Sequence, residues 1–311
     1  MSGQPAGQPG EPEPQHGTVR LSIIIVNWNT RDLLCACLDS LRSVLDDPGH
    51  EVLVVDNGSS DGSVEMVRTE FAAVRLLSLN QNLGFSRGNN VALAQARGKY
   101  LMLLNSDTEI IGDALETMCN FLDQNPTVGA LGPQLLNPDG TVQLSCRTFP
   151  SYKTALFHRK SLITKLFPRN RFSQQYLMTG IGHGKTMEVD WVIGACLMTR
   201  RAVVEQVGLL DEEFFMYAED VDWCYRMRLA GWAIVYVPEA QVLHHYEKSA
   251  VKMPYRMNFQ RHRSMWRFYM KHYSRGIMLL DVATFIGIVT RFVLMLTRNA
   301  VHSAFGGEKR P

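Results

Sequence analysis

The sequence lacks several features that would mark a zinc-binding, secreted or nucleic-acid-binding protein. Its six cysteines (residues 35, 37, 119, 146, 196 and 224) form no CxxC pair, which argues against a zinc or redox site and favours reduced thiols in the cytoplasm. The 32 lysines and arginines nearly balance 30 acids, so charge does not point to nucleic acid as a partner. The first residues lack the apolar run of a secretory signal, and their Pro, Gly and Gln content predicts a disordered tail over residues 1–19.

What the chain does contain, from Leu21 onward, is an alternation of apolar strands and amphipathic helices. The runs LSIIIVNW, EVLVVD, VRLLSL and YLMLLN have strand length, and the segments between them place apolar residues at helical spacing. Units of strand, helix and strand about thirty residues long are typical of a doubly wound, mostly parallel α/β sheet. We therefore predict a Rossmann-like, nucleotide-binding half over residues 20–110.

The pattern changes after residue 110, where we predict a second, acceptor-binding half over residues 111–250. Residues 150–186 are basic and weakly periodic, which predicts a mobile loop over the site. The other predicted elements are a helix over 113–126, a hairpin over 128–149 with its turn at 137–140, a strand over 189–199, a helix from about 219 and a strand over 233–246.

Polar side chains follow four of the predicted parallel strands at the point where each strand ends. In doubly wound sheets, ligands bind beyond the carboxyl ends of the strands, so Asn27, Asp56, Asn80 and residues 105–107 should line one rim. Asp56 directly ends its strand, and its carboxylate can accept hydrogen bonds from a nucleobase or from ribose hydroxyls. Asp61 precedes a glycine and reads more simply as a turn residue.

The strand tip Asn105, Ser106 and Asp107 predicts a metal site. Mg²⁺ and Mn²⁺ take oxygen ligands, commonly one or two carboxylates together with substrate phosphates. The alternative role, capping the next helix, is better suited to residues 112–113 because they lie closer to that helix. The histidine pair at 244–245 follows a strand and offers a third ligand, with an ordinary surface or core histidine as the alternative.

Three acids, Glu219, Asp220 and Asp222, stand at the start of a predicted helix. The helix dipole favours negative charge there, so capping is one explanation of the cluster. Asp222 lies four residues before Arg226, which predicts an ion pair on one face of the helix. This pairing leaves Asp220 free to act as a general base.

Six stretches, taken in order, resemble the family 2 glycosyltransferases of GT-A fold. They are SIIIVNWN, VVDNGSSDGS, NQNLGFSRGNN, LLNSD, GLLDEEFFMYAEDVDWCYR and VLHHYEKS, and together they cover roughly residues 20–250. The resemblance is to the branch that contains rhamnosyltransferases and related cell-wall enzymes. It implies an inverting, metal-assisted transfer of a sugar, with rhamnose the first choice, from a dTDP- or UDP-sugar donor to a glycan or lipid-linked acceptor.

The resemblance also implies roles for individual residues. Asp220 would be the catalytic base, Asp56 would contact the nucleotide base, and Asp107 would hold Mg²⁺ or Mn²⁺ on the diphosphate. His244 would be the metal-ligating histidine, with His245 as the alternative. Further donor-binding residues would be Asn27, Asn82, Gly84 and Ser106, and further acceptor or supporting residues would be Trp191, Gly194, Glu219 and His245. The Asp-x-Asp motif of many relatives is Asn-Ser-Asp here, so Asn105 has no assigned role.

Two other classes of protein share parts of this pattern. A nucleotidyltransferase would show a GxGxRxxP loop after its first strand, where this chain has NWNTRD. A catalytically silent scaffold would bind nucleotide-sugar and membrane without turnover, but the joint presence of Asp56, Asp107, Asp220 and the histidine pair argues against it.

The C-terminal residues 251–311 predict a basic, amphipathic helical extension. Residues 251–275 carry seven Lys or Arg and no acid, and the 21 residues that follow are long enough to span a membrane. Asp281 and Arg291 argue against an unaided span, and they form a narrow polar stripe with residues 284, 298 and 302. We predict a helix lying on the anionic inner face of the cell membrane. The alternatives are a spanning helix, or one packed on the protein's own core or on a partner in a homodimer.

Overall fold

The structure is a computed structural model that describes residues 19–150, 183–245 and 254–304. The tail predicted over residues 1–19 and nearly all of the loop predicted over 150–186 lie outside these ranges.

The first part of the chain builds four parallel strands whose carboxyl ends meet at one rim. The register pairs Asn27 with Asp56 and places Val26 beside Asn105, so the predicted rim forms. The strands lie in the order 3-2-1-4 and are β1 (Leu21–Asn27), β2 (His50–Asp56), β3 (Arg75–Ser78) and β4 (Tyr100–Asn105).

The second part of the chain extends the same sheet past β4, in the order β4-β11-β6-β12-β5. β11 is antiparallel to both of its neighbours, β4 and β6, whereas β6 and β12 are parallel. The added strands are β5 (Thr108–Ile111), β6 (Val128–Leu136), β7 (Val142–Gln143), β9 (Met187–Val189), β11 (Cys196–Arg200) and β12 (Ala233–His244), and β8 (Cys146–Arg147) pairs with β10 (Trp191–Val192) outside this sheet.

Two of these elements differ from the sequence prediction. The hairpin at 128–149 forms as β6 and β7, but the single strand expected over 189–199 is broken into pieces around residues 193–195. The strand β5 was not predicted. It pairs with the end of β12, with Thr108 opposite His244. Because β5 follows β4 closely in the chain, this pairing places the carboxyl end of β4 near the carboxyl end of β12.

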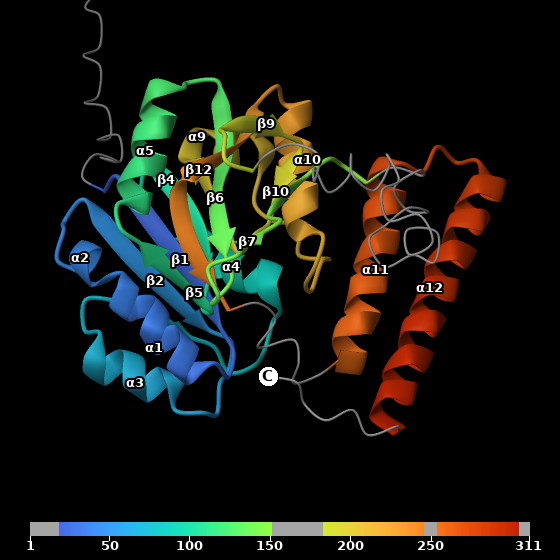
Figure 1. Cartoon of the computed structure of the whole chain (residues 1–311), viewed down its shortest axis with the longest axis horizontal. Helices are drawn as coiled ribbons and strands as arrows, with labels where there is room; N and C mark the ends of the chain where they lie inside the picture. The colour runs from blue at the N-terminus through green and yellow to red at the C-terminus, as the bar shows by residue number, and fades with distance from the viewer. Residues whose placement is uncertain (1–18, 151–182, 246–253, 305–311) are drawn as a thin grey trace, which may run out of the picture.

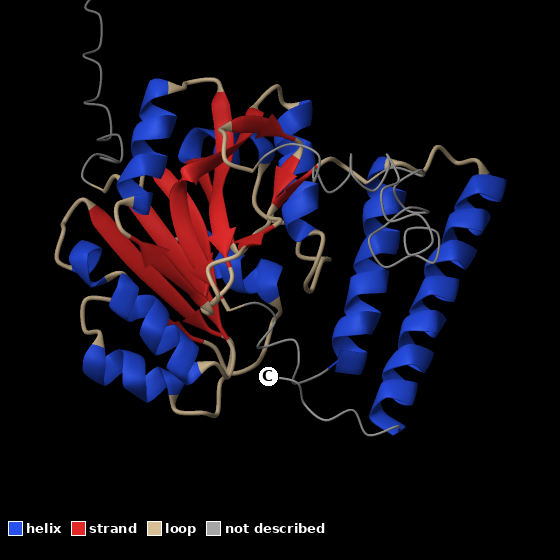
Figure 2. Cartoon of the chain, viewed as in Figure 1, coloured by secondary structure: helices blue, strands red, loops and turns tan. Residues whose placement is uncertain are grey.

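The sheet is covered on both faces by helices, as Figure 2 shows. Successive side chains of β1 point to opposite faces, so Ile23 and Ile25 pack in one buried cluster and Ile24 in the other. The first cluster uses α1 (Arg31–Ser40), α2 (Arg42–Leu45), α3 (Ser63–Glu70) and α5 (Ala114–Gln124), and the second uses α4 (Phe85–Leu93), α9 (Arg201–Val207) and α10 (Glu219–Leu229).

Two long helices, α11 (Pro254–His272) and α12 (Met278–Ala304), lie side by side, and α11 lies between α12 and the edge of the sheet domain that carries α10 (Figure 1). The described part of the polar stripe predicted on α12 faces α11, where Arg291 Nη1 lies 3.7 Å from Met265 Sδ. Asp281 accepts hydrogen bonds from the hydroxyls of Tyr269, at 2.6 Å, and Ser274, at 3.0 Å. Because α11 takes up this stripe, the opposite, apolar face of α12 is the one that remains exposed.

The exposed face of α12 is long and almost wholly apolar. The stretch Met278–Thr297 is apolar and long enough to cross a membrane, with a mean hydropathy of 2.0, and none of it is buried in the structure. Met278 and Leu279 are each 79% exposed. Other large exposed apolar side chains of this helix are Leu280, Val282, Phe285, Ile286, Val289, Val293 and Leu294. The side chains of residues 298–304 lie outside the described part of the helix.

Candidate active site

The carboxyl ends of β1 and β2 carry a buried pair of polar side chains. The amide nitrogen of Asn27 donates to Asp56 Oδ2 at 2.9 Å, and the backbone N–H of Ser59 donates to Asp56 Oδ1 at 2.8 Å. Both Asn27 and Asp56 are almost fully buried. These donors fix the carboxylate in place, and its remaining lone pairs can accept from the N–H or hydroxyl groups of a ligand.

Asp61, five residues after the end of β2, binds the backbone at the starts of two helices. Its Oδ2 accepts from the backbone N–H of Arg31 at 2.9 Å, and its Oδ1 accepts from the backbone N–H of Ser63 at 3.1 Å. These donors stand at the starts of α1 and α3, where backbone N–H groups lack partners within the helix. Asp61 therefore has the structural role expected for it.

Gly84 allows a close contact between the segment before α4 and the segment before α10. Its φ of 88° and ψ of −179° are open to glycine alone, and an added Cβ would lie 2.5 Å from the carbonyl oxygen of Phe215. Asn82 Oδ1 accepts from the N–H of Gly84 at 2.9 Å, and the N–H of Phe85 donates to Phe215 O at 2.7 Å. These contacts hold Asn82 and Gly84 close to the segment that precedes α10.

Asp107 and His244 meet because β5 pairs with the end of β12. His244 Nε2 lies 3.4 Å from Asp107 Oδ1, and both side chains are nearly buried. Gln143 Nε2 donates to the carbonyl of His244 at 2.7 Å, which leaves Gln143 Oε1 to accept from His244 Nδ1 at 2.9 Å. A proton of the imidazole therefore sits on Nδ1, and Nε2 is the ring nitrogen that faces the carboxylate.

A carboxylate oxygen and an imidazole Nε2 that face each other fit a shared cation, which would take the lone pair of Nε2. Both groups are ligands of first-row divalent metals, and the Gln143 contact is the usual way in which a ligating histidine is oriented. Within residues 19–150, 183–245 and 254–304, no group of three or more His, Cys, Asp or Glu side chains is arranged to hold a metal. The remaining ligands would have to come from a diphosphate and water.

His245 faces elsewhere, because neighbouring side chains of a strand point to opposite sides. Its Nε2 lies 2.7 Å from Glu109 Oε1, and its backbone N–H donates to Asp107 O at 2.9 Å. Of the two histidines considered from the sequence, His244 is the one whose ring meets Asp107.

Asp220 lies in the first turn of α10, and two backbone N–H groups donate hydrogen bonds to its carboxylate. The N–H of Gly194 donates to Asp220 Oδ2 at 3.0 Å, and the N–H of Val221 donates to Oδ1 at 2.8 Å. Burial raises the pKa of Asp220 and outweighs these hydrogen bonds, which act in the opposite direction. Gly194 lies beside this side chain, and an added Cβ would be in ordinary van der Waals contact with Asp220 Cβ, at 3.4 Å.

A short run of backbone contacts connects Asp220 to the strand tip that carries Asp107. Gly194 adjoins Ala195, whose carbonyl accepts from the N–H of Asn105 at 2.9 Å, two residues before Asp107. On the other side, Ser106 Oγ lies 2.9 Å from Thr30 Oγ1, which in turn donates to Asn27 Oδ1. Hydrogen bonds and short stretches of backbone therefore connect Asn27, Asp56, Ser106 and Asp220 along one rim.

The neighbours of Asp220 in the acidic cluster have different environments. Glu219 is buried, Oε2 has no hydrogen-bond partner among the described residues, and burial together with the charge of Asp220 raises its pKa well above the usual range. Asp222 forms the predicted ion pair, with Arg226 Nε at 2.9 Å from Asp222 Oδ2. Glu219 is thus a candidate hydrogen-bond donor, and Asp222 a charged structural residue.

Trp191 lies in β10, three residues before Gly194, and is buried. Its indole N–H donates to the carbonyl of Thr148 at 3.0 Å, and the guanidinium of Arg147 lies 5.3 Å from the ring centre. These contacts tie β10 to β8 and so support the segment that presents Gly194.

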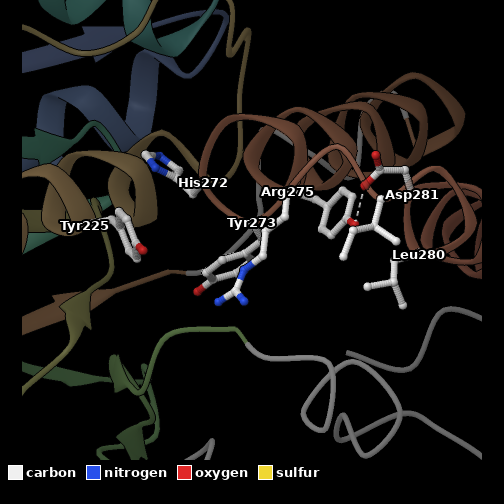
Figure 3. A pocket seen from close by; sticks show the side chains of 8 residues that line it. Tyr225, His272, Tyr273, Arg275, Leu280 and Asp281 are labelled. Carbon is white, nitrogen blue, oxygen red and sulfur yellow. Dashed lines mark hydrogen bonds between the residues drawn. The ribbon is translucent and has the colours of Figure 1, made fainter.

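A cavity of about 430 Å³ lies away from this rim, between α10 and the turn that joins α11 to α12. Figure 3 shows Tyr225, His272, Tyr273 and Arg275 around it, with Asp281 bound to the hydroxyl of Tyr269 on the α12 side. Its walls are aromatic on one side, and Ile277 and Leu280 join the apolar surface of α12 on the other.

Sequence reasoning missed the residues that act through long-range contacts. Gln143 orients His244 from a hairpin about a hundred positions earlier, and nothing in the local pattern of TVQLS marks it. Lys271 and His272 contact Asp222 from α11, at 2.7 Å each, and lie in a segment that composition alone describes as basic and aromatic.

The sheet order, the rim of carboxylates and the acidic helix define a GT-A type of nucleotide-sugar transferase fold, and comparisons with known proteins agree. The chain matches the description "Glycosyl transferase family 2" over residues 22–208. It belongs to glycosyltransferase family 2 and is a glycosyltransferase, which confirms the resemblance found in the sequence motifs.

Relatives and solved structures extend this similarity beyond the matched residues. The N-acetylglucosaminyl-diphospho-decaprenol L-rhamnosyltransferase of Mycobacterium tuberculosis is 31% identical over 84% of this chain and 91% of its own length. Rhamnosyltransferase WbbL of Escherichia coli is 26% identical over 72% of this chain and 82% of its own. A mannosyltransferase from Pyrobaculum calidifontis, solved with GDP-Man and Mn²⁺, shares the fold with a TM-score of 0.55 at 16% identity, covering 97% of this chain and 80% of that one.

Proposed function

We propose that this glycosyltransferase transfers rhamnose from a dTDP- or UDP-linked donor to a lipid-linked glycan acceptor. Residues 20–110 would form the donor half and residues 111–250 the acceptor half. Support for the sugar and the acceptor comes from the mycobacterial relative, which is named for both and is similar over nearly its whole length. The observation that carries the proposal is the convergence, at one rim, of Asp56, the Asp107–His244 pair and the partly buried Asp220.

The donor would lie along the strand ends. Asp56 would accept from the nucleobase or ribose, and Asn27 keeps its carboxylate oriented. Asp107 and His244 would hold Mg²⁺ or Mn²⁺ with the diphosphate, and the cation, when bound, would stabilise the negative charge of the departing nucleotide. Asn82 and Gly84 would border the donor from the segment before α4. Mn²⁺ in the solved mannosyltransferase supports a divalent metal in this fold.

Asp220 would act as the base for the acceptor hydroxyl. An alcohol is a poor nucleophile until a positioned group takes its proton, and such assistance contributes about 10² to 10⁴ in rate. Its raised pKa makes the carboxylate a stronger base than an exposed aspartate. One base and one attack opposite the leaving group give a single displacement, which inverts the anomeric centre. Glu219 and the N–H of Gly194 would support the acceptor side of the site.

The exposed apolar face of α12 supports attachment to the inner surface of the cell membrane, where a lipid-linked acceptor would be reached. Apolar surfaces of this length are seldom left in water, and basic residues of α11 favour an anionic lipid surface. The polar stripe is already used by α11, so the helix would present one uniform apolar side to the bilayer.

Ligand-induced stabilisation tests the donor. The melting temperature of the purified protein would be measured with dTDP, UDP and GDP, each with Mn²⁺, Mg²⁺ or EDTA. A nucleotide at a hundred times its dissociation constant should stabilise the protein by about 2.7 kcal/mol. A metal-dependent shift with dTDP or UDP supports the site, whereas no shift with any nucleotide contradicts it.

Asp220→Asn tests the base. The substitution keeps the size of the side chain, so dTDP with Mn²⁺ should stabilise the variant as it does the wild type, while sugar transfer should fall by at least about 10²-fold. Asp113→Asn, an exposed aspartate without a side-chain capping bond, serves as the matched control. Near-normal turnover of Asp220→Asn would show that another group is the base.

A further inference from the structure

The turn that delivers Asp220 to the site has an unfavourable backbone conformation. Tyr217 has a φ of 71° and Ala218 a φ of 64°, and α10 begins at the next residue. Side chains with a Cβ rarely adopt this region, and such residues persist only where the surrounding structure holds them. The nature of that support decides where Asp220 points.

The support comes from α11, which lies along this turn. Ser264 Oγ donates to the carbonyl of Met216 at 2.9 Å. The guanidinium of Arg261 stacks 4.5 Å from the ring centre of Tyr217, and that of Arg256 lies 5.2 Å from the ring centre of Phe215. Phe215, Met216 and Tyr217, the three residues before Ala218, therefore each contact a side chain of α11.

The strongest contacts converge on Asp222, two residues after Asp220. Its side chain is fully buried, and Lys271 Nζ and His272 Nε2 each lie 2.7 Å from its Oδ1. Burial opposes its ionisation, but the hydrogen bonds from His272 and Lys271 prevail and lower the pKa of Asp222 to about 2. An ionised carboxylate only accepts, so His272 Nε2 carries the proton and donates.

The same helix also holds the chain upstream of the turn. Lys271 Nζ lies 2.7 Å from Asp211 Oδ2 as well, and Arg267 contacts that oxygen at 3.1 Å. The ring of His272 packs 4.4 Å from that of Tyr225, one helical turn further along α10 (Figure 3). Lys271 and His272 thus join the two ends of the segment that contains the unfavourable turn.

We infer that His272 and Lys271 are positioning residues for the catalytic base: through Asp222 they fix the first turn of α10 and so the direction of Asp220. The inference rests on the proposed role of Asp220 and adds to it that the base is oriented by a helix that lies beyond the residues matched to the family. A displacement of a catalytic group by about 1 Å can lower turnover about 10²-fold, so contacts at this distance from the chemistry suffice.

The test compares two substitutions of His272. In His272→Leu the donor to Asp222 is lost, and kcat for transfer from dTDP-rhamnose should fall about 10- to 100-fold. The KM for the donor should stay within about twofold, because Asp56, at the end of β2, and Asp107, between β4 and β5, are not part of α10. In His272→Gln the side-chain amide can donate to Asp222 in place of Nε2, so most of the lost kcat should return.

His50→Leu is the matched control. His50 Nδ1 lies 2.8 Å from Asp47 Oδ2, so the substitution breaks the same kind of contact at the amino end of β2, opposite the rim. It should leave kcat unchanged. Equal loss of kcat in the Leu and Gln variants of His272, or a loss no greater than in the control, would overturn the inference.

Hydrogen–deuterium exchange tests the positioning role of His272 independently of whether rhamnose is the transferred sugar. Amides of residues 217–223 should exchange faster in His272→Leu than in the wild type and in His272→Gln. If the wild type transferred no rhamnose at all, the donor proposal would fail, but exchange in this segment would still decide whether His272 holds the turn. Unchanged exchange at 217–223 would refute the positioning role.

Discussion

Gln143 offers the sharpest test of the metal site, because it touches the proposed ligand without reaching the metal. It fixes the backbone of His244 through one hydrogen bond, at 2.7 Å, and the tautomer of its ring through another, at 2.9 Å. Gln143→Leu keeps the approximate size of the side chain and removes both bonds. The imidazole would then be free to rotate or to carry its proton on Nε2, which abolishes the lone pair that faces Asp107.

The expected magnitude follows from this change. Loss of a partner that orients a ligating histidine typically weakens metal binding 10- to 100-fold, or by about 1.4 to 2.7 kcal/mol. Binding of Mn²⁺ in the presence of dTDP would be followed by electron paramagnetic resonance, which counts free and bound ion directly. Affinity for dTDP in EDTA should not change.

The control is Gln124→Leu, which makes the same chemical change at an exposed position near the end of α5. It should bind Mn²⁺ as the wild type does. A folded Gln143→Leu protein with wild-type affinity for Mn²⁺ would refute the view that His244, held by Gln143, is a metal ligand.

Three further predictions concern the backbone, the base and the membrane. Gly84→Ala should destabilise the protein by about 1–3 kcal/mol, seen as a melting temperature several degrees lower, whereas Gly184→Ala, with open space around it, should not. Because Asp220 acts only when ionised and burial raises its pKa, kcat/KM should rise with pH through a limb that lies above the usual range of aspartate. The double substitution Leu279→Ser and Leu294→Ser should weaken binding to phosphatidylglycerol vesicles by about 3 kcal/mol, or roughly 100-fold, in a flotation assay, without a change in melting temperature.

Each of these predictions has a clear contrary result. A Gly84→Ala protein as stable as the control would mean that the chain near α10 can move aside. A pH profile whose acid limb lies at or below that of an exposed aspartate would exclude the buried carboxylate as the base. Unchanged flotation of the leucine variant would remove α12 as the site of membrane attachment.

Much of the first half of the fold can be predicted because it depends on patterns of neighbouring residues in the sequence. The strands β1, β2 and β4 are largely apolar and largely buried, and the parallel register then places their polar ends together without further information. Asn27 and Asp56 could therefore be assigned to one rim before any contact was known. The ion pair of Asp222 with Arg226 is local in the same sense, since it follows from the pitch of one helix.

The rest depends on contacts that local patterns do not encode. β5 has only four residues, and their mixture of polar and apolar side chains does not predict a strand. Its pairing with β12 nevertheless brings His244 to Asp107. The partners of Asp222 on α11 lie about fifty positions away. The polar stripe of α12 was visible in the sequence, but whether it would face water or another helix depended on Tyr269 and Ser274, whose place was unknown.

The single apolar side of α12 has a consequence for how the enzyme searches for its acceptor. Twenty-seven residues of helix extend about 40 Å, so attachment along this line would leave the molecule free to glide and spin on the bilayer but not to roll over. Collisions with a lipid-borne sugar would then occur in two dimensions and from one approach direction. The height of the active-site rim above the bilayer would then be fixed, so the enzyme would select acceptors by the distance of their sugar from the lipid.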